Sequence, residues 1–226
     1  MIANLNNSLH LFLKTQATIE LYIPFLLKEY FLSLKYNFKL YQINEKIYSF
    51  WDEIFQEILN LPDHTFIITV NPKYSDDFKN YLSETQILKL LLSSQFNIYH
   101  HNIFTPGRIG EGVEDTLNSL LSNSKKEGKT IIWENDNLGK TLKEHTKGKF
   151  SRLKELPEFW AIKDDIYGII YLPAENYYFQ KDFSFFLCSG ESFDDAIHKT
   201  ENNIIMRSRL FRLKNRIFKT ISAAGF

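Results

Sequence analysis

The sequence predicts an α/β protein built on a short parallel sheet. Apolar, β-branched runs at 65–70, 95–104 and 129–133 alternate with amphipathic segments at 75–92 and 112–122. Strands separated by segments of that length are typical of right-handed βαβ units, because a parallel pair needs a long crossover. A chain of 226 residues that is 44% hydrophobic and 24% charged is globular and long enough to bury a core without disulfides or metals.

Residues 1–61 are predicted to form a helical layer. Apolar residues recur there at roughly helical spacing until Pro24 interrupts the pattern: Leu9, Phe12, Leu13, Ala17 and Leu21. The segments 25–41 and 45–59 continue the pattern, the second with large aromatic side chains on one broad face. We expect these aromatic residues to pack in the core, with a groove for a partner helix as the alternative.

Residues 62–150 are predicted to form a βαβαβ core. The strand at 65–70 is bounded by Pro62 and Pro72, and 75–92 is either one helix or two short ones, with Ser83 capping the second. A strand at 95–104, a helix at 112–122 and a strand at 129–133 follow.

Residues 151–226 are predicted to add an antiparallel extension and a final helix, which completes one domain. Strand-like runs occupy 159–163, 166–172 and 177–188, and Asp164 with Asp165 can turn the first into the second as a hairpin. Ser192 and Asp195 have capping-box spacing, and 203–221 supplies the final amphipathic helix.

The balance of charges excludes a strong overall electrostatic attraction of the whole chain to nucleic acid or anionic lipid. The chain has 27 basic and 27 acidic residues, so its formal net charge is zero. Its first ten residues lack a positively charged signal-peptide start, and no apolar run reaches the roughly 20 residues of a membrane span. The single cysteine fits a reducing compartment. We therefore expect a cytoplasmic protein with no membrane partner.

A glycine-rich turn lies between the predicted strand at 95–104 and the helix at 112–122. It contains these candidate ligand-binding residues: Thr105, Gly107, Arg108, Gly110, Glu111 and Gly112. The spacing G-x-x-G-x-G differs from the dinucleotide fingerprint G-x-G-x-x-G. The acids Glu111, Glu114 and Asp115 suit the positive end of a helix dipole, but they would repel a bound phosphate. Arg108 is the only nearby positive charge that offsets this repulsion.

The carboxyl ends of the predicted strands offer a candidate enzyme site, because ligands of parallel sheets bind at that edge. Asn71 and Lys73 follow the first core strand, and the glycine-rich turn follows the second. The candidate catalytic acids are Glu114, Glu134 and Asp136, which can bind ribose hydroxyls or act as a base or nucleophile. The alternative is a turn that only reverses the chain, with its acids stabilising the helix start.

The last segment is basic and amphipathic. Six cations follow Met206 without an acid among them: Arg207, Arg209, Arg212, Lys214, Arg216 and Lys219. Six apolar residues supply the other face: Leu210, Phe211, Leu213, Ile217, Phe218 and Ile221. Such a helix can dock on the sheet while its basic face meets RNA, DNA or an acidic protein surface. A solvated face that binds nothing is the alternative.

No metal or cofactor is expected. His100 and His101 are adjacent in a predicted strand, so their side chains point to opposite faces and cannot share one ion. No H-x-H, H-x-x-x-H or C-x-x-C pair occurs in the chain.

Three blocks together resemble a family of phage- and plasmid-borne proteins that includes a type V anti-CRISPR. They are 40–47 leading through Leu61, Pro62 and Asp63 to the strand at 65–70; the block 159–162; and the block 186–192 before the apolar final helix. The resemblance implies a non-enzymatic regulator that lowers expression of a CRISPR nuclease through nascent-chain recognition. The long segment between the first two blocks departs from that family, and no functional residue is carried over from it.

Two functions follow as expectations. The first is a non-enzymatic, cytoplasmic binding or regulatory protein of a mobile element that engages a protein or nucleic acid. The alternative is a Rossmann-like enzyme that handles nucleotides or nucleosides at the strand ends. The enzyme requires a crevice at those ends, whereas the binding protein requires an exposed basic or aromatic patch.

Overall fold

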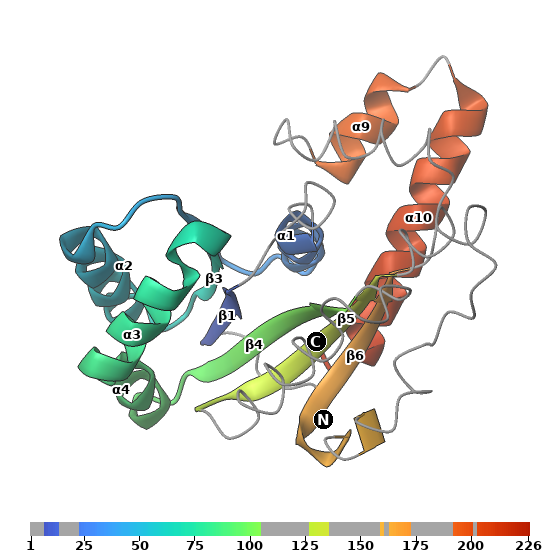
Figure 1. The fold of residues 1–226 in the computed structure, drawn as a ribbon. Helices are drawn as coiled ribbons and strands as arrows, with labels where there is room; N and C mark the ends of the chain where they lie inside the picture. The colour runs from blue at the N-terminus through green and yellow to red at the C-terminus, as the bar shows by residue number, and fades with distance from the viewer. Residues whose placement is uncertain are drawn as a thin grey trace.

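A single parallel sheet organises the protein (Figure 1). The computed structural model describes residues 7–13, 23–104, 127–135, 159–160, 163–172, 192–200 and 203–226. Its strands are β1 (Ser8–Phe12), β2 (Phe38–Ile43), β3 (Thr65–Val70), β4 (Asn97–Phe104), β5 (Lys129–Asn135) and β6 (Ile166–Leu172). They lie in the order β2-β3-β1-β4-β5-β6, and every neighbouring pair is parallel. The predicted α/β class is confirmed.

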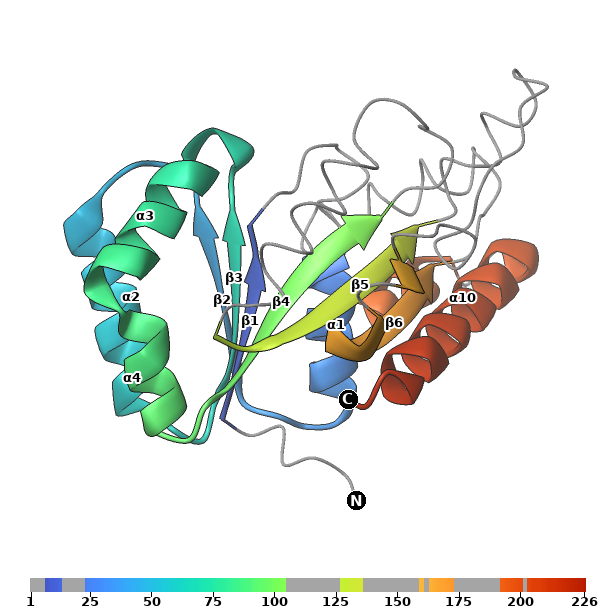
Figure 2. The same ribbon diagram turned by 60° about the horizontal axis from the view of Figure 1, so that its bottom comes forward.

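Helices cover both faces of the sheet (Figure 2). One face carries α1 (Ile23–Ser33), α9 (Phe193–Lys199) and α10 (Ile204–Ala223), and the other carries α2 (Tyr48–Asn60), α3 (Ser75–Thr85) and α4 (Ile87–Ser93). Two 3-10 turns, Pro72–Tyr74 and Lys163–Asp165, follow β3 and precede β6. Each face has its own hydrophobic core, because alternate residues of every strand point to opposite sides.

The strand order reverses in the middle of the sheet. The chain leaves β1 through α1 toward β2 at one edge, whereas β4, β5 and β6 follow one another toward the opposite edge. The carboxyl ends of β1 and β4 therefore flank the switch point, where parallel sheets form a crevice for ligands.

The prediction of an all-helical N-terminal layer is wrong. Residues 8–12 form the central strand β1, and residues 38–43 form the edge strand β2. All five residues of β1 are buried, with Leu9 and Leu11 on one face and His10 and Phe12 on the other. Ser8, Leu9, His10 and Leu11 do alternate in polarity, but the strand is only five residues long. Leu9, Phe12 and Leu13 also recur at helical spacing, so the pattern alone favours a helix.

The predicted antiparallel extension is also wrong in the described residues. Phe159 and Trp160 are helical, and Lys163 begins a 3-10 turn instead of ending a strand. The strand β6 pairs parallel with β5, so Asp164 and Asp165 do not form a hairpin turn. The predicted helix at 112–122 and strand at 177–188 lie outside the described residues.

Several local predictions are confirmed. The helix predicted at 45–59 is α2, and the segment 75–92 forms two helices. They are separated by Gln86 in the left-handed conformation (φ 52°), instead of by a cap at Ser83. Ser192 and Asp195 form the expected capping box at the start of α9, and the final helix is α10.

Candidate functional site

The predicted strand-end residues that the structure describes lie at the ends of two separated strands, β3 and β5. The Asn71 side chain accepts a hydrogen bond from the Lys73 backbone N–H at 3.0 Å, and so caps the 3-10 turn after β3. The Lys73 ammonium lies 5.1 Å from the centre of the Tyr74 ring. Glu134 lies on β5 and is 8% exposed. Because β1 and β4 separate β3 from β5, Asn71 and Glu134 are three strand spacings apart, about 14 Å.

The remaining strand-end candidates lie outside the described residues: Thr105, Gly107, Arg108, Gly110, Glu111, Gly112, Glu114 and Asp136. The predicted nucleotide site therefore stays a prediction. The strand order places the end of β4, from which the glycine-rich turn departs, beside the end of β1 at the switch point.

The basic helix α10 has one buried and one exposed face. Leu210, Leu213, Ile217 and Ile221 pack into the core, and Arg207, Arg209, Arg212, Arg216 and Lys219 are exposed. Lys214 differs from the other predicted cations, because its ammonium lies 2.7 and 2.9 Å from the two carboxylate oxygens of Asp194 on α9. Lys214 thus joins α10 to α9 and does not belong to the exposed basic face.

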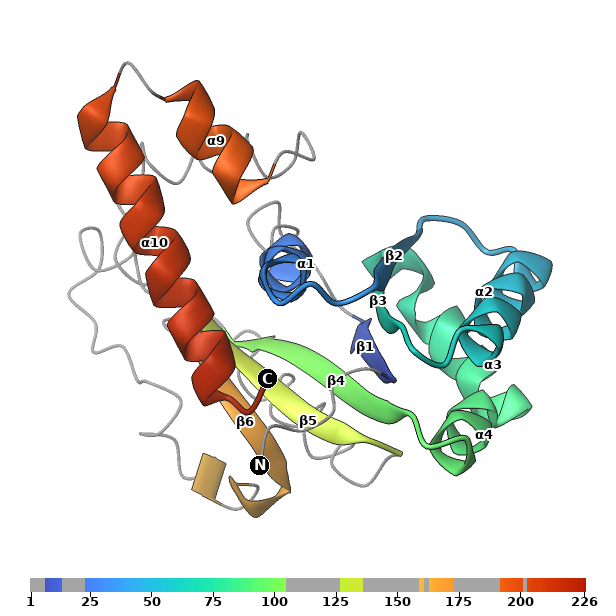
Figure 3. The same ribbon diagram turned by 180° about the vertical axis from the view of Figure 1, so that it is seen from behind.

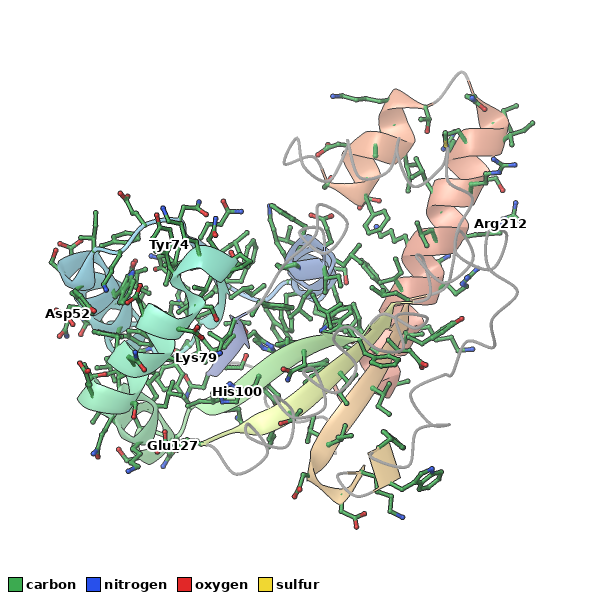
Figure 4. All side chains as sticks on the ribbon, in the orientation of Figure 1. Asp52, Tyr74, Lys79, His100, Glu127 and Arg212 are labelled. Carbon is green, nitrogen blue, oxygen red and sulfur yellow. The ribbon has the colours of Figure 1, made fainter. Side chains whose placement is uncertain are left out.

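Four of the exposed cations form a line, which we call the basic stripe: Arg209, Arg212, Arg216 and Lys219. Their spacing i, i+3, i+7, i+10 places them on one side of the helix over about 15 Å. Arg212 lies on the outer side of α10 (Figure 4), where its guanidinium donates to the Ser208 carbonyl at 3.3 Å and to the Ser208 hydroxyl at 3.4 Å. That contact orients Arg212 without neutralising it.

The first turns of α10 also expose apolar side chains. Ile204, Ile205 and Phe211 are 80%, 68% and 56% exposed. Figure 3 shows this end of α10 projecting beyond the sheet, with only α9 beside it among the described elements. Phe211 was expected on the buried face, but Leu210 and Leu213 hold that face and turn Phe211 outward.

A buried polar chain, by which we mean the hydrogen-bonded side chains of Ser8, His10, His101 and Trp133, lies between the sheet and α1. The sequence pattern did not indicate it. His10 Nδ1 and His101 Nε2 are 2.8 Å apart, His10 Nε2 lies 3.0 Å from the Ser8 hydroxyl, and Trp133 Nε1 donates to His101 Nδ1 at 2.8 Å. Phe31 and Phe226 pack on His10 with ring centres 5.1 and 5.4 Å away. His10 lies beside His101 because β1 and β4 are neighbouring strands, and a helix predicted over residues 9–13 gives no such register.

Burial keeps both imidazoles neutral. It lowers the pKa of His10 to about 3 and the pKa of His101 well below its usual value. His100 points to the opposite face, as predicted, and its Nε2 lies 2.8 Å from the Glu127 carbonyl oxygen to which it donates. Both imidazoles are buried and neutral, so these hydrogen bonds lie within the hydrophobic core.

Compared with family models, curated proteins and solved structures, the chain has no match. The resemblance to the type V anti-CRISPR family therefore stays a prediction. Among the described residues, no helix is both long and apolar enough to cross a membrane, and no three His, Cys, Asp or Glu side chains there are grouped so as to hold a metal ion.

Proposed function

We propose that this protein binds a nucleic acid through the basic stripe on α10. The observation that carries the proposal is a row of four exposed cations on a helix whose opposite face is anchored in the core. No Asp or Glu occurs between residues 203 and 226, and no described carboxylate forms an ion pair with Arg209, Arg212 or Lys219. The exposure of the stripe along α10 supports contact with an external polyanion.

The dimensions of the stripe suit a phosphate backbone. A stripe of about 15 Å spans about four phosphates of one strand, since B-form DNA carries one charge per 3.4 Å of each strand. Three of the four cations are arginines, whose planar guanidinium binds phosphate oxygens in pairs. Because the net charge of the chain is zero, the attraction is local to α10.

The test compares wild type with a variant that carries Arg209→Gln, Arg212→Gln and Arg216→Gln. Binding of labelled single-stranded RNA, single-stranded DNA and duplex DNA of about 20 nucleotides is measured by fluorescence anisotropy at low salt. We expect the triple variant to bind at least tenfold more weakly than wild type, because three phosphate contacts are lost.

A matched control carries Lys35→Gln, Lys79→Gln and Lys89→Gln, which removes the same charge from helices α3 and α4 and from the turn after α1. This control is expected to bind within about twofold of wild type. No binding by wild type, or equal weakening in both variants, contradicts the proposal. Binding of acidic peptides but no nucleic acid assigns the stripe to a protein partner and also contradicts it.

A second function is supported by the strand order. The switch point between β1 and β4 is where doubly wound sheets bind nucleotides, and the glycine-rich turn departs from the end of β4. A nucleotide present at 100 times its dissociation constant adds about 2.7 kcal/mol to the free energy of unfolding, or roughly 5–10 °C in melting temperature. A shift that persists in the α10 triple variant and disappears in Arg108→Ala assigns the ligand to the switch point, whereas no shift with any nucleotide rejects this function.

A further inference from the structure

The outer side of β2 carries backbone groups that no described residue pairs. The inner side is occupied, because the Thr65 N–H donates to the Asn37 carbonyl and the Asn71 N–H donates to the Ile43 carbonyl, both at 2.9 Å. In a parallel ladder, alternate residues point their N–H and C=O to the same side. The backbone N–H and C=O groups of Lys39 and Tyr41 therefore point toward β3, as the Ile43 carbonyl does. Those of Phe38, Leu40 and Gln42 point outward.

We propose that this edge pairs with β2 of a second copy of the chain. The two strands run antiparallel about a twofold axis through Leu40, so Leu40 lies opposite Leu40, and Phe38 lies opposite Gln42 of the other copy. Each of these three pairs exchanges two N–H···O bonds. All outward groups of β2 are thereby satisfied, and the two six-stranded sheets join into one.

The ladder geometry selects this arrangement. In a parallel pair, the residue whose N–H and C=O point toward the partner strand lies opposite a residue whose groups point away, so the two strands are shifted by one residue. A twofold axis places identical residues opposite each other and cannot produce this shift. Parallel pairing of two β2 edges therefore leads to an open filament, whereas the antiparallel pair closes as a dimer. A register shifted by two residues leaves one outward residue of each copy unpaired.

The charges next to this edge are complementary across the axis. Lys39 and Tyr41 both donate to Glu57 on α2, so the single charged side chain of β2 is already neutralised. In the proposed register Lys39 lies opposite Tyr41 of the second copy, and therefore close to that copy's Glu57. The two Lys39–Glu57 pairs, one from each copy, then lie close together across the axis, with each lysine near a carboxylate of both copies.

The strand lacks two of the features that usually protect an edge. Its six residues contain no proline, and its register with β3 is continuous, without a bulge. Its one lysine, Lys39, is paired with Glu57. The half-buried Phe38 and Leu40 extend the apolar face beyond the sheet edge. Because α10 packs against β6 at the opposite edge, the dimer leaves both basic stripes exposed.

The test measures the molecular mass of the full chain by analytical ultracentrifugation from about 1 µM to about 200 µM. Wild type is expected to reach twice the 26.7 kDa of one chain. Leu40→Pro removes an outward N–H and leaves the bonds to β3 in place, as edge strands tolerate, so it is expected to stay monomeric. Leu40→Val keeps the N–H and is expected to dimerise like wild type.

Amide hydrogen exchange of wild type gives a second measurement that does not depend on whether Leu40→Pro folds. The amides of Leu40 and Gln42 are expected to become at least tenfold slower as the concentration rises, whereas those of Lys39 and Tyr41, bonded to β3, stay slow throughout. A wild type that is monomeric at every concentration, a dimeric Leu40→Pro, or exchange at Leu40 that does not depend on concentration overturns the proposal.

Discussion

At the scale of single residues, the buried polar chain has a defined direction. An indole N–H can only donate, so Trp133 fixes His101 Nδ1 as an acceptor and places the His101 proton on Nε2. That proton is donated to His10 Nδ1, so His10 carries its own proton on Nε2 and donates it to the Ser8 hydroxyl, which donates to Thr65 Oγ1 at 3.3 Å. Both imidazoles are therefore neutral, and each ring nitrogen has a hydrogen-bond partner. Such pairing lowers the cost of burying polar side chains in the core.

This arrangement predicts an acid-sensitive fold. The pKa of His10 is about 3 in the native state and about 6.5 when unfolded, so between these values the unfolded chain binds a proton that the native chain does not. The free energy of unfolding therefore falls as pH drops below 6.5, and His10 alone accounts for about 2 kcal/mol at pH 5.

Urea unfolding at pH 5.0 and 7.5 measures this loss. His101, whose pKa is also lowered by burial, adds to the loss in the same direction. The variant His198→Gln, at an exposed position on α9, is expected to keep the wild-type pH dependence. Equal stability of wild type at the two pH values contradicts the neutral, buried assignment.

At the scale of elements, the end of α10 packs closely against β6 because the strand has a glycine, Gly168, at the point of contact. A Cβ atom at Gly168 would lie 2.7 Å from the Ala224 carbonyl oxygen and 3.1 Å from its Cβ, closer than backbone atoms tolerate. Gly168 therefore permits the last turn of α10 to contact the strand, and this contact positions the basic stripe on the sheet.

We expect Gly168→Ala to destabilise the fold by about 1–3 kcal/mol, because the end of α10 must move away from β6. Chemical denaturation monitored by circular dichroism gives the change. Ser222→Ala, on the exposed side of the same turn, is the control and is expected to change stability by less than about 0.5 kcal/mol. A Gly168→Ala variant as stable as wild type shows that this close approach does not hold the helix.

The elements that the sequence predicts correctly are those with a local signal. The helix α2 has a wide apolar face, α9 has the Ser192 and Asp195 capping box, and β3 lies between two prolines. The strands β1 and β2 are missed because their assignment depends on which neighbours cover them. Lys214 and Phe211 are misplaced on α10 for a similar reason, since only the docked position of α9 and the sheet decides which face is buried.

At the scale of the whole molecule, two edges of one sheet carry the two proposed interactions. The β6 edge supports α10 and its basic stripe, and the β2 edge carries the outward backbone groups, unpaired among the described residues, that we propose bind a second copy. Because the sheet lies between them, nucleic-acid binding and dimerisation use separate surfaces. A dimer displays two basic stripes, which raises the effective concentration of the second on a long nucleic acid.

The central claim, that the basic stripe contacts phosphates, is tested most directly by the salt dependence of binding. The association constant for a single-stranded oligonucleotide is measured from about 50 to about 200 mM salt, and four phosphate contacts predict a slope of log K against log salt near −3. The triple variant with Arg209→Gln, Arg212→Gln and Arg216→Gln is expected to reduce the slope to about −1. A slope that is the same in wild type and in this variant contradicts the account.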